Sequence, residues 1–151
     1  MDIGIVGLGL IGGSLGLDLR SQGHRVLGLS RKQTTCERAI ERGAVDSAST
    51  HPSLLRTADL VFLCTPLGVM QSAVAELVPF LTPDTVLTDV GSVKGWVMAT
   101  IAPLWRNFVG GHPMAGTAES GIEVAQRDLF VNAAYVLTPI ATTPKPAIEQ
   151  V

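Results

Sequence analysis

A run of closely spaced glycines near the start of the chain constrains its fold most strongly. Residues 7–12 read G-L-G-L-I-G, directly after an apolar β-type run and directly before a helical pattern. In that context the G-x-G-x-x-G spacing is typical of a dinucleotide-binding turn. The first glycine permits the turn, the second lets the backbone approach a pyrophosphate, and the third lets helix and strand pack closely. We therefore expect cofactor contacts from Gly7, Leu8, Gly9, Leu10, Ile11 and Gly12.

The remainder of the chain alternates short apolar β-type runs with longer helical patterns. The predicted strands are residues 3–6, 25–29, a short one beginning at 45–46, 60–64, 85–88, one opening at 108–109, and 134–137. The predicted helices are residues 10–22, 33–42, 69–81 and 93–104. Strands that alternate with helices pair in parallel through right-handed crossovers. The pattern predicts an α/β fold with a doubly wound, mostly parallel Rossmann sheet.

Composition excludes several other classes of protein. The 151 residues suit one domain, and 46% hydrophobic residues with 5% aromatics suit a buried sheet of small aliphatic side chains. A net charge of −2 offers no basic surplus for nucleic acid. Cys36 and Cys64 have no accompanying histidine cluster, so we expect no metal site, no disulfide and a reducing cytoplasm. The uncharged stretch 3–17 follows Asp2 and is rich in glycine, so neither a leader nor a membrane anchor is expected.

The segment after the second predicted strand indicates which dinucleotide binds. An NAD site places Asp or Glu there to bind the ribose 2′-OH, about 20 residues past the glycines. This chain instead reads S-R-K-Q-T-T from Ser30 onward, with no carboxylate before Glu37. Such side chains bind a 2′-phosphate by charge-assisted hydrogen bonds, which predicts NADP with contacts from Ser30, Arg31 and Thr35. In the alternative interpretation, Arg31 and Lys32 only solvate the start of the next helix.

One of the three histidines occupies a position suited to chemistry. His112 follows F-V-G-G at the carboxyl end of a predicted strand and precedes Pro113, whereas His24 and His51 lie in polar loop segments. Ligands of open α/β sheets lie outside the carboxyl ends of the strands. A neutral imidazole there could accept a proton from a hydroxyl as hydride leaves the same carbon. Position alone leaves this role and a structural one equally open.

Two more predicted strands end at the same rim, followed by C-T-P at residues 64–66 and D-V-G-S-V-K at 89–94. From these segments we expect cofactor contacts by Cys64, Thr65, Pro66, Asp89 and Gly91. Ser92 stands where the next helix is predicted to start. Its hydroxyl suits either a helix N-cap or a substrate oxygen, and spacing does not choose between them.

Several of these segments together resemble a known family. Residues 7–14, 64–66, 89–94 and above all 111–117, G-H-P-M-A-G-T, are similar to the prephenate/arogenate dehydrogenases of tyrosine biosynthesis. The likeness continues through D-L-F at 128–130 and Y-V-L-T-P at 135–139, and so covers essentially the whole chain. The Ser-Arg pair after the second strand looks most like the NADP-using arogenate branch.

The resemblance implies an oxidoreductase that oxidatively decarboxylates arogenate, prephenate or both, with hydride transfer to NADP+ and without a metal. It makes His112 the catalytic histidine that accepts the proton of the ring hydroxyl, and Ser92 the serine that hydrogen-bonds that hydroxyl. Thr117 matches a position that lines the substrate pocket. Family members often carry an acidic residue directly after that position, where this chain has Ala118 and then Glu119.

Family members continue into an all-helical domain that dimerises and supplies cations for the substrate carboxylates, and this domain is expected to be absent here. We therefore expect residues 1–140 to form the NADP-binding domain and 141–151 to begin a linker or helix. The apolar residues of that helix, Ala147, Ile148 and Val151, would then lack a partner. A homodimer is expected only with the second domain, and this chain alone is expected to show little activity.

Two rival interpretations remain at this stage. One is another small NADP-dependent oxidoreductase on the same fold, such as a β-hydroxyacid dehydrogenase or an imine reductase. Those enzymes typically use a lysine from a second domain and lack the H-P-M-A-G segment. The other is a non-catalytic NADP-binding module, which would bind the cofactor without turning over a substrate.

Overall fold

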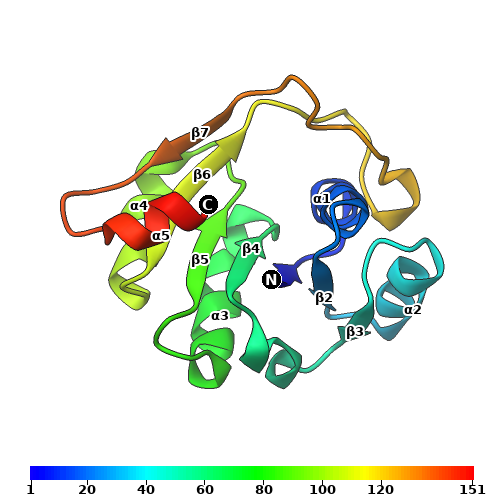
Figure 1. Cartoon of the computed structure of the whole chain (residues 1–151), viewed down its shortest axis with the longest axis horizontal. Helices are drawn as coiled ribbons and strands as arrows, with labels where there is room; N and C mark the ends of the chain where they lie inside the picture. The colour runs from blue at the N-terminus through cyan, green and yellow to red at the C-terminus, as the bar shows by residue number, and fades with distance from the viewer.

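Seven strands form the sheet in the order β3-β2-β1-β4-β5-β6-β7 (Figure 1). The structure is a computed structural model that describes residues 1–151. Pairing is parallel from β3 through β6, and only β7 runs antiparallel to its neighbour. The strands are β1 Asp2–Val6, β2 Arg25–Leu29, β3 Ser47–Ser49, β4 Leu60–Leu63, β5 Val86–Asp89, β6 Phe108–Pro113 and β7 Tyr135–Thr138. This confirms the predicted doubly wound, mostly parallel sheet.

Helices cover both faces of the sheet. They are α1 Leu10–Ser21, α2 Gln33–Glu41, α3 Leu67–Leu77, α4 Lys94–Ile101 and α5 Lys145–Gln150. Short 3-10 turns lie at η1 Pro52–Thr57, η2 Val78–Phe80, η3 Ala102–Leu104 and η4 Ile122–Val124. In Figure 1, β3 and α2 lie at one end of the sheet, and β7 and α5 lie at the other. No helix of this fold has the length and hydrophobicity to span a bilayer.

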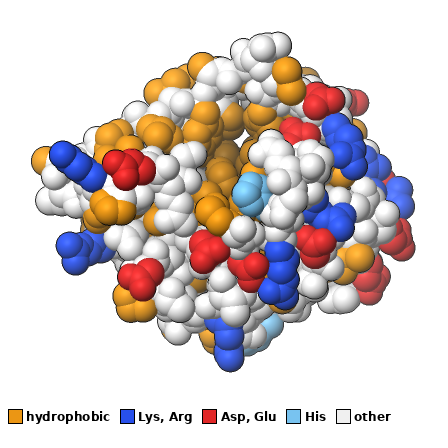
Figure 2. Space-filling model, viewed as in Figure 1, with side chains coloured by type: hydrophobic (Ala, Val, Ile, Leu, Met, Phe, Trp, Pro, Cys, Tyr) orange, Lys and Arg blue, Asp and Glu red, His pale blue; other side chains and the backbone are white.

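The helices bury the sheet on both faces. Alternate residues of each strand point to opposite faces, so each strand contributes side chains to both. On one face, Val6, Val61 and Leu87 pack against Met70 and Val97 of α3 and α4. The opposite face divides into two clusters, one beneath α1 and α2 and one beneath α1 and α5. Figure 2 shows charged side chains around the edge of the molecule and a hollow lined by hydrophobic side chains between α1 and β6.

The carboxy-terminal helix α5 packs on this sheet, so the expectation that its apolar residues lack a partner is wrong. Ala147 is only 3% exposed, and it lies in a cluster with strand residues that include Ile3 and Val109. Ile148 and Val151 are half-buried against the same cluster. The region of the sheet that α1 leaves uncovered accepts this short helix.

Two expected helix boundaries differ from the structure. The helix predicted over 69–81 begins at Leu67 and ends at Leu77, where the chain passes into the 3-10 turn η2. Pro79 lies in the first turn of η2 and has no N–H to continue the α-helical pattern. The helix predicted over 93–104 begins at Lys94 with Val93 as its N-cap, so Ser92 makes no capping hydrogen bond. The capping role considered for Ser92 is therefore wrong.

The ends of two other predicted strands are now defined. The third strand forms at Ser47–Ser49, one residue beyond the predicted start at 45–46. The strand predicted to open at 108–109 runs to Pro113, so His112, expected at its carboxyl end, lies within the last residues of β6. Its continuation pairs with β7 in a register that joins Gly110 to Thr138 and Pro113 to Tyr135. The two glycines weaken the local strand signal, and an antiparallel partner distant in sequence restores the strand.

Candidate active site

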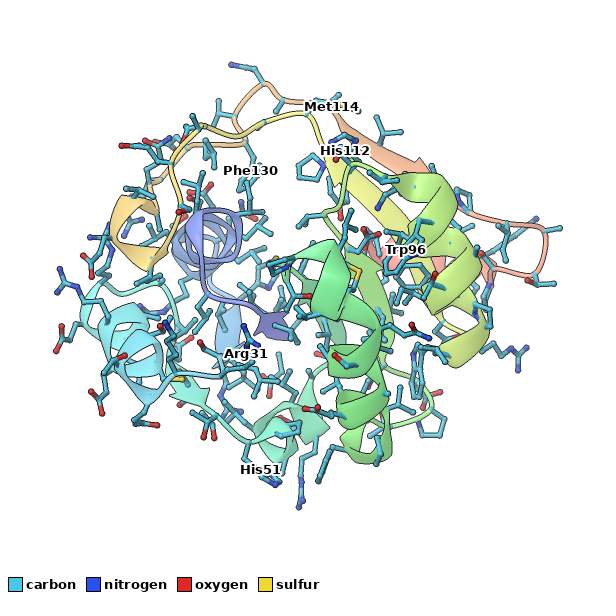
Figure 3. The ribbon with its side chains drawn as sticks, turned by 180° about the vertical axis from the view of Figure 1, so that it is seen from behind. Arg31, His51, Trp96, His112, Met114 and Phe130 are labelled. Carbon is cyan, nitrogen blue, oxygen red and sulfur yellow. The ribbon has the colours of Figure 1, made fainter.

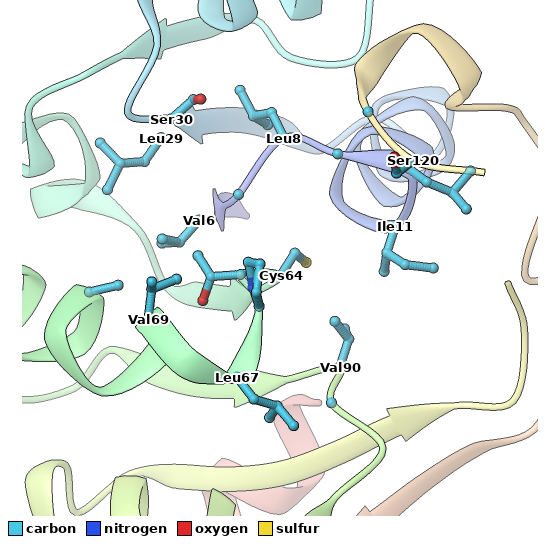
Figure 4. A pocket seen from close by; sticks show the side chains of 18 of the residues that line it. Val6, Leu8, Ile11, Leu29, Ser30, Cys64, Leu67, Val69, Val90 and Ser120 are labelled. Carbon is cyan, nitrogen blue, oxygen red and sulfur yellow. The ribbon is translucent and has the colours of Figure 1, made fainter. Parts of the chain in front are cut away.

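A cleft of about 920 Å³ opens at the carboxyl ends of the strands, where the strand order reverses between β1 and β4. The close view in Figure 4 shows Leu8 and Ser30 on one side of it and Val90 on the other. The sequence-predicted residues that line it are Gly7, Leu8, Gly9, Leu10, Ile11, Ser30, Arg31, Thr35, Cys64, Thr65, Pro66, Gly91, Ser92, His112 and Thr117. Gly12 and Asp89 lie outside its wall.

The three motif glycines meet different steric conditions. Gly7 has a φ of +96°, and a Cβ there would lie 2.7 Å from the carbonyl oxygen of Cys64. A Cβ on Gly12 would lie 2.0 Å from the carbonyl oxygen of Gly7, because α1 packs directly against the turn. A Cβ on Gly9 would meet nothing within 4 Å. The backbone at Gly9, which caps α1, is therefore open to a phosphate at the positive end of the helix.

The end of the cleft at β2 is cationic. Arg31 and Lys32 line it, are exposed, and form no ion pair with any carboxylate of the chain. Glu37, the first carboxylate after β2, lies on α2 outside the cleft wall, where it accepts a hydrogen bond from Gln33. Figure 3 shows where Arg31 lies relative to His112. A 2′-phosphate at this end would meet the side chains of Arg31 and Lys32.

His112 brings an imidazole to the other part of the cleft. It lies near the carboxyl end of β6, is half-buried, and pairs in register with Val136 of β7. His112 lines the cleft, and its ring makes no hydrogen bond within the chain. Ser92 and Thr117 line the same cleft. His51 does not line the cleft, and its ring lies edge-on to the ring of Phe80, with 5.2 Å between the ring centroids.

One residue of the cleft wall has a buried polar atom without a partner. The hydroxyl of Thr65, in the segment that follows β4, makes no hydrogen bond within the chain. Buried hydroxyls are nearly always hydrogen-bonded, so this one suits a polar group of a bound ligand. Neighbouring Cys64 is a different case, because burial first and the charge of Asp89 second raise the pKa of its thiol. Cys64 thus remains protonated and lines the cleft as an apolar contact.

Comparison with known proteins identifies the family. The family model described as "Prephenate dehydrogenase, nucleotide-binding domain" matches residues 15–151. The chain belongs to the prephenate dehydrogenase family. This confirms the resemblance drawn from the sequence motifs.

Individual members of the prephenate dehydrogenase family are also similar to this chain. The crystal structure of Synechocystis arogenate dehydrogenase is 50% identical with a TM-score of 0.96, covering 99% of this chain and 54% of that one. A prephenate dehydrogenase from A. aeolicus, crystallised with hydroxyphenyl propionate and NAD+, is 30% identical with a TM-score of 0.93, covering 99% and 54%. The Bacillus subtilis (strain 168) prephenate dehydrogenase is 37% identical over 97% of this chain. The chain spans 40–53% of the length of the curated relatives it matches.

One departure from the family pattern can be placed in the structure. The acidic residue that often follows the Thr117 position is Ala118 here, and Ala118 does not line the cleft. Glu119 does line it, and its N–H donates to the hydroxyl of Thr117 at 3.2 Å. The carboxylate is therefore present in the cleft wall one position later.

Asp89 was expected to contact the cofactor, but its carboxylate makes its contacts with other residues of the protein. Its carboxylate is fully buried, accepts hydrogen bonds from the N–H groups of Gly91 at 2.8 Å and Gly111 at 3.0 Å, and pairs with Lys94. Burial lowers the pKa of Lys94, and the neighbouring carboxylate partly offsets this effect. Lys94, which the sequence places on the rim, does not line the cleft.

Sequence reasoning missed one wall of the cleft. Val69, Ser72, Ala73 and Glu76 of α3 all line it. Their spacing of three, one and three residues places them on one face of a helix, so the signal was present in the sequence. Leu77 and Val74 form the opposite, buried face of α3.

The packing at Gly12 leads to a testable prediction. Replacing Gly12 with Ala should lower the free energy of unfolding by about 1–3 kcal/mol, because the new methyl group meets backbone that has no space to move. Thermal or urea unfolding measures this change, and calorimetry should show weakened dinucleotide binding. Gly68→Ala, at a position with nothing within 4 Å, serves as the matched control. Equal stability of the Gly12 variant and the control would contradict the close packing.

Proposed function

We propose that this protein oxidatively decarboxylates arogenate, and prephenate less efficiently, with hydride transfer to NADP+. The observation that carries the proposal is that one cleft at the switch point is lined by the glycine turn, by Arg31 and by His112. Membership of the prephenate dehydrogenase family supports the reaction class. The order of the two substrates is supported by the 50% identity to the Synechocystis arogenate dehydrogenase.

The residues at the glycine turn fit a nicotinamide dinucleotide. Open backbone at Gly9 and the N-terminus of α1 would bind the pyrophosphate, and the unpartnered hydroxyl of Thr65 suits another polar group of the same ligand. Arg31, assisted by Ser30 and Thr35, would bind the 2′-phosphate that distinguishes NADP from NAD. Bound NADP+ supplies the acceptor for the hydride.

His112 is the base in this proposal. The substrate ring carries a hydroxyl on the carbon that loses hydride, and the imidazole accepts the proton of that hydroxyl. Ser92 lines the same cleft, and its hydroxyl would hydrogen-bond the substrate oxygen and keep it facing the imidazole. The electron pair of the breaking carbon–carboxylate bond enters the ring and moves onto the ring oxygen as CO2 leaves. That oxygen takes the proton back from the imidazolium of His112, and an aromatic phenol forms. Thr117 would contact the ring from the adjoining wall.

A substrate panel tests this proposal. Initial rates of NADPH formation by the full natural gene product would be measured with arogenate, with prephenate and with a simple β-hydroxyacid. Arogenate should give the largest kcat/KM, and the β-hydroxyacid should give none. Turnover of the β-hydroxyacid alone would identify the rival oxidoreductase. Cofactor binding without turnover of any substrate would identify a non-catalytic module.

Residues 1–151 on their own should bind NADP+ but turn over arogenate slowly. The substrate carries two carboxylates, whereas Arg31 and Lys32 at the opposite end are the only lysine or arginine side chains that line the cleft. A missing charge-assisted hydrogen bond costs roughly 1.5–3 kcal/mol of binding. We expect kcat/KM for arogenate at least about 100-fold below a typical enzyme value of about 10⁴ M⁻¹s⁻¹ or more in a steady-state assay. A rate near the typical value would show that this segment contains the whole site.

A further inference from the structure

The parallel pairing of β5 with β6 stops just before the candidate base. Its register joins Leu87 to Phe108 and Thr88 to Val109, and no further pair follows. Strand β6 nevertheless continues through Gly111 and His112. Over this final part, the backbone ladder of β6 is formed with β7 alone.

Side chains replace the missing backbone contact on the β5 side. In the ladder between β5 and β6, the N–H of Leu87 donates to the carbonyl of Asn107 at 3.0 Å. If the regular pattern of a parallel ladder continued, the N–H of Gly111 would donate to the carbonyl of Asp89. That N–H instead donates to the carboxylate of Asp89 at 3.0 Å. The carbonyl of Asp89 accepts a hydrogen bond from the hydroxyl of Tyr135 at 2.9 Å.

Lys94 completes the arrangement from the first turn of α4. Its ammonium group donates to the carbonyl of Gly111 at 2.6 Å and also pairs with the carboxylate of Asp89. The side chains of Lys94 and Asp89 are 15% and 0% exposed. Asp89 therefore holds the peptide group that precedes Gly111, and Lys94 holds the peptide group that joins Gly111 to His112.

No side chain fits at Gly111, the residue whose backbone Asp89 and Lys94 hold. A Cβ on Gly111 would lie 2.3 Å from the hydroxyl oxygen of Tyr135 and 2.8 Å from the carbonyl oxygen of Asp89. The peptide group next to His112 is thus confined by an ion pair on one side and by a tyrosine on the other. Fixing that peptide group fixes the direction in which the His112 side chain leaves the strand.

We propose that Asp89 and Lys94 are positioning residues, which aim the imidazole of His112 into the cleft by holding the Gly111 backbone. The inference rests on the proposed role of His112 as the base. Neither residue lines the cleft, so their effect on catalysis acts through the backbone. A displacement of about 1 Å in a reacting group costs on the order of 10²-fold in rate.

Histidine ring signals in NMR spectra test the positioning without any turnover. Lys94→Met keeps the length of the side chain and removes the hydrogen bond to Gly111. In this chain with NADP+ bound, the variant should shift the ring signals of His112 and leave those of His24 and His51 in place. Lys145→Met, the same change at an exposed site, is the matched control and should shift none of the three.

Kinetics of the full natural gene product supply the second readout. Lys94→Met should lower kcat about 100-fold and leave the Kd for NADP+ within about twofold, whereas Lys145→Met should leave both unchanged. If Lys94→Met does not fold, Tyr135→Phe replaces it. That change frees the Asp89 carbonyl to compete for the Gly111 N–H, and it should move the His112 signals in the same experiment.

The outcomes separate this inference from the proposed function. His112 signals that stay unchanged in a folded variant would overturn the positioning role, whatever happens to kcat. Signals that move while kcat remains within twofold would support the positioning and overturn the assignment of His112 as the base. Signals that move together with a loss of kcat support both.

Discussion

Replacing His112 with Asn is expected to lower kcat at least about 100-fold and to leave the Kd for NADP+ within about twofold. Asn retains a polar side chain of similar width but cannot accept the proton of the substrate hydroxyl, and general-base catalysis is typically worth 10²–10⁴ in rate. A change in kcat without a change in cofactor affinity is the signature of a group that acts on the reacting atoms. Steady-state kinetics and calorimetry on the full natural gene product measure the two quantities.

His24→Asn is the matched control for this experiment, because His24 lies in the turn between α1 and β2 and does not line the cleft. It should leave both quantities unchanged. A His112→Asn protein that keeps more than half of its turnover rate would remove His112 from the catalytic role.

Arg31 is expected to make the chain select NADP+ over NAD+ by at least about tenfold in affinity. Arg31→Ala should weaken NADP+ binding by about 1–3 kcal/mol and change NAD+ binding little, because only the former carries a 2′-phosphate for the guanidinium. Calorimetric titration of both cofactors into both proteins measures this difference. The unpaired state of Arg31 in the structure supports the prediction, since no internal ion pair has to break.

Arg56→Ala provides the control for the loss of one positive charge. Arg56 is exposed on η1 and lies outside the cleft wall, so its removal should affect the two cofactors equally. Equal affinities of NADP+ and NAD+ for the unmodified chain would contradict the assignment of NADP.

The central part of the fold could be predicted from the sequence because its signals are local. The glycine turn, strand β2 and the end of the helix predicted over 33–42 follow from short-range patterns. Helix α2 ends at Glu41, and Gly43 follows with a φ of +71°, which is common just after a helix. The pairing of β6 beyond Val109 had a weaker local signal. It depends on pairing with β7 more than twenty residues later, and the glycines of β6 carry no side chain to indicate a strand.

Some residues of the candidate site could likewise be predicted from the sequence, and others could not. His112, Ser92 and Arg31 stand at strand ends, so the rule that ligands lie at carboxyl edges places them in the cleft. The same rule also predicts that Asp89 and Lys94 face the cleft, but these two residues form an ion pair inside the protein. A carboxylate and an ammonium group five residues apart can turn outward to a ligand or inward to each other. Local sequence does not decide this, because the buried acceptor on Gly111 belongs to another strand.

The packing of the last helix, α5, also depends on residues distant in the sequence. A helix as short as α5 has little stability of its own, and it forms here against a hydrophobic part of the sheet. The uncovered surface near Ile3 and Val109 exists only after β1 and β6 have joined the same sheet. No pattern within residues 141–151 reveals that surface.

Transfer of deuterium from labelled arogenate to the cofactor tests the proposed reaction. The substrate would carry deuterium on the ring carbon that bears the hydroxyl, and the full natural gene product would be supplied with NADP+. We expect each aromatic product molecule to be formed together with one deuterated NADPH and one CO2. We also expect this transfer to fall with kcat in His112→Asn. NADPH formed without deuterium, or without an aromatic product, would contradict the proposed reaction.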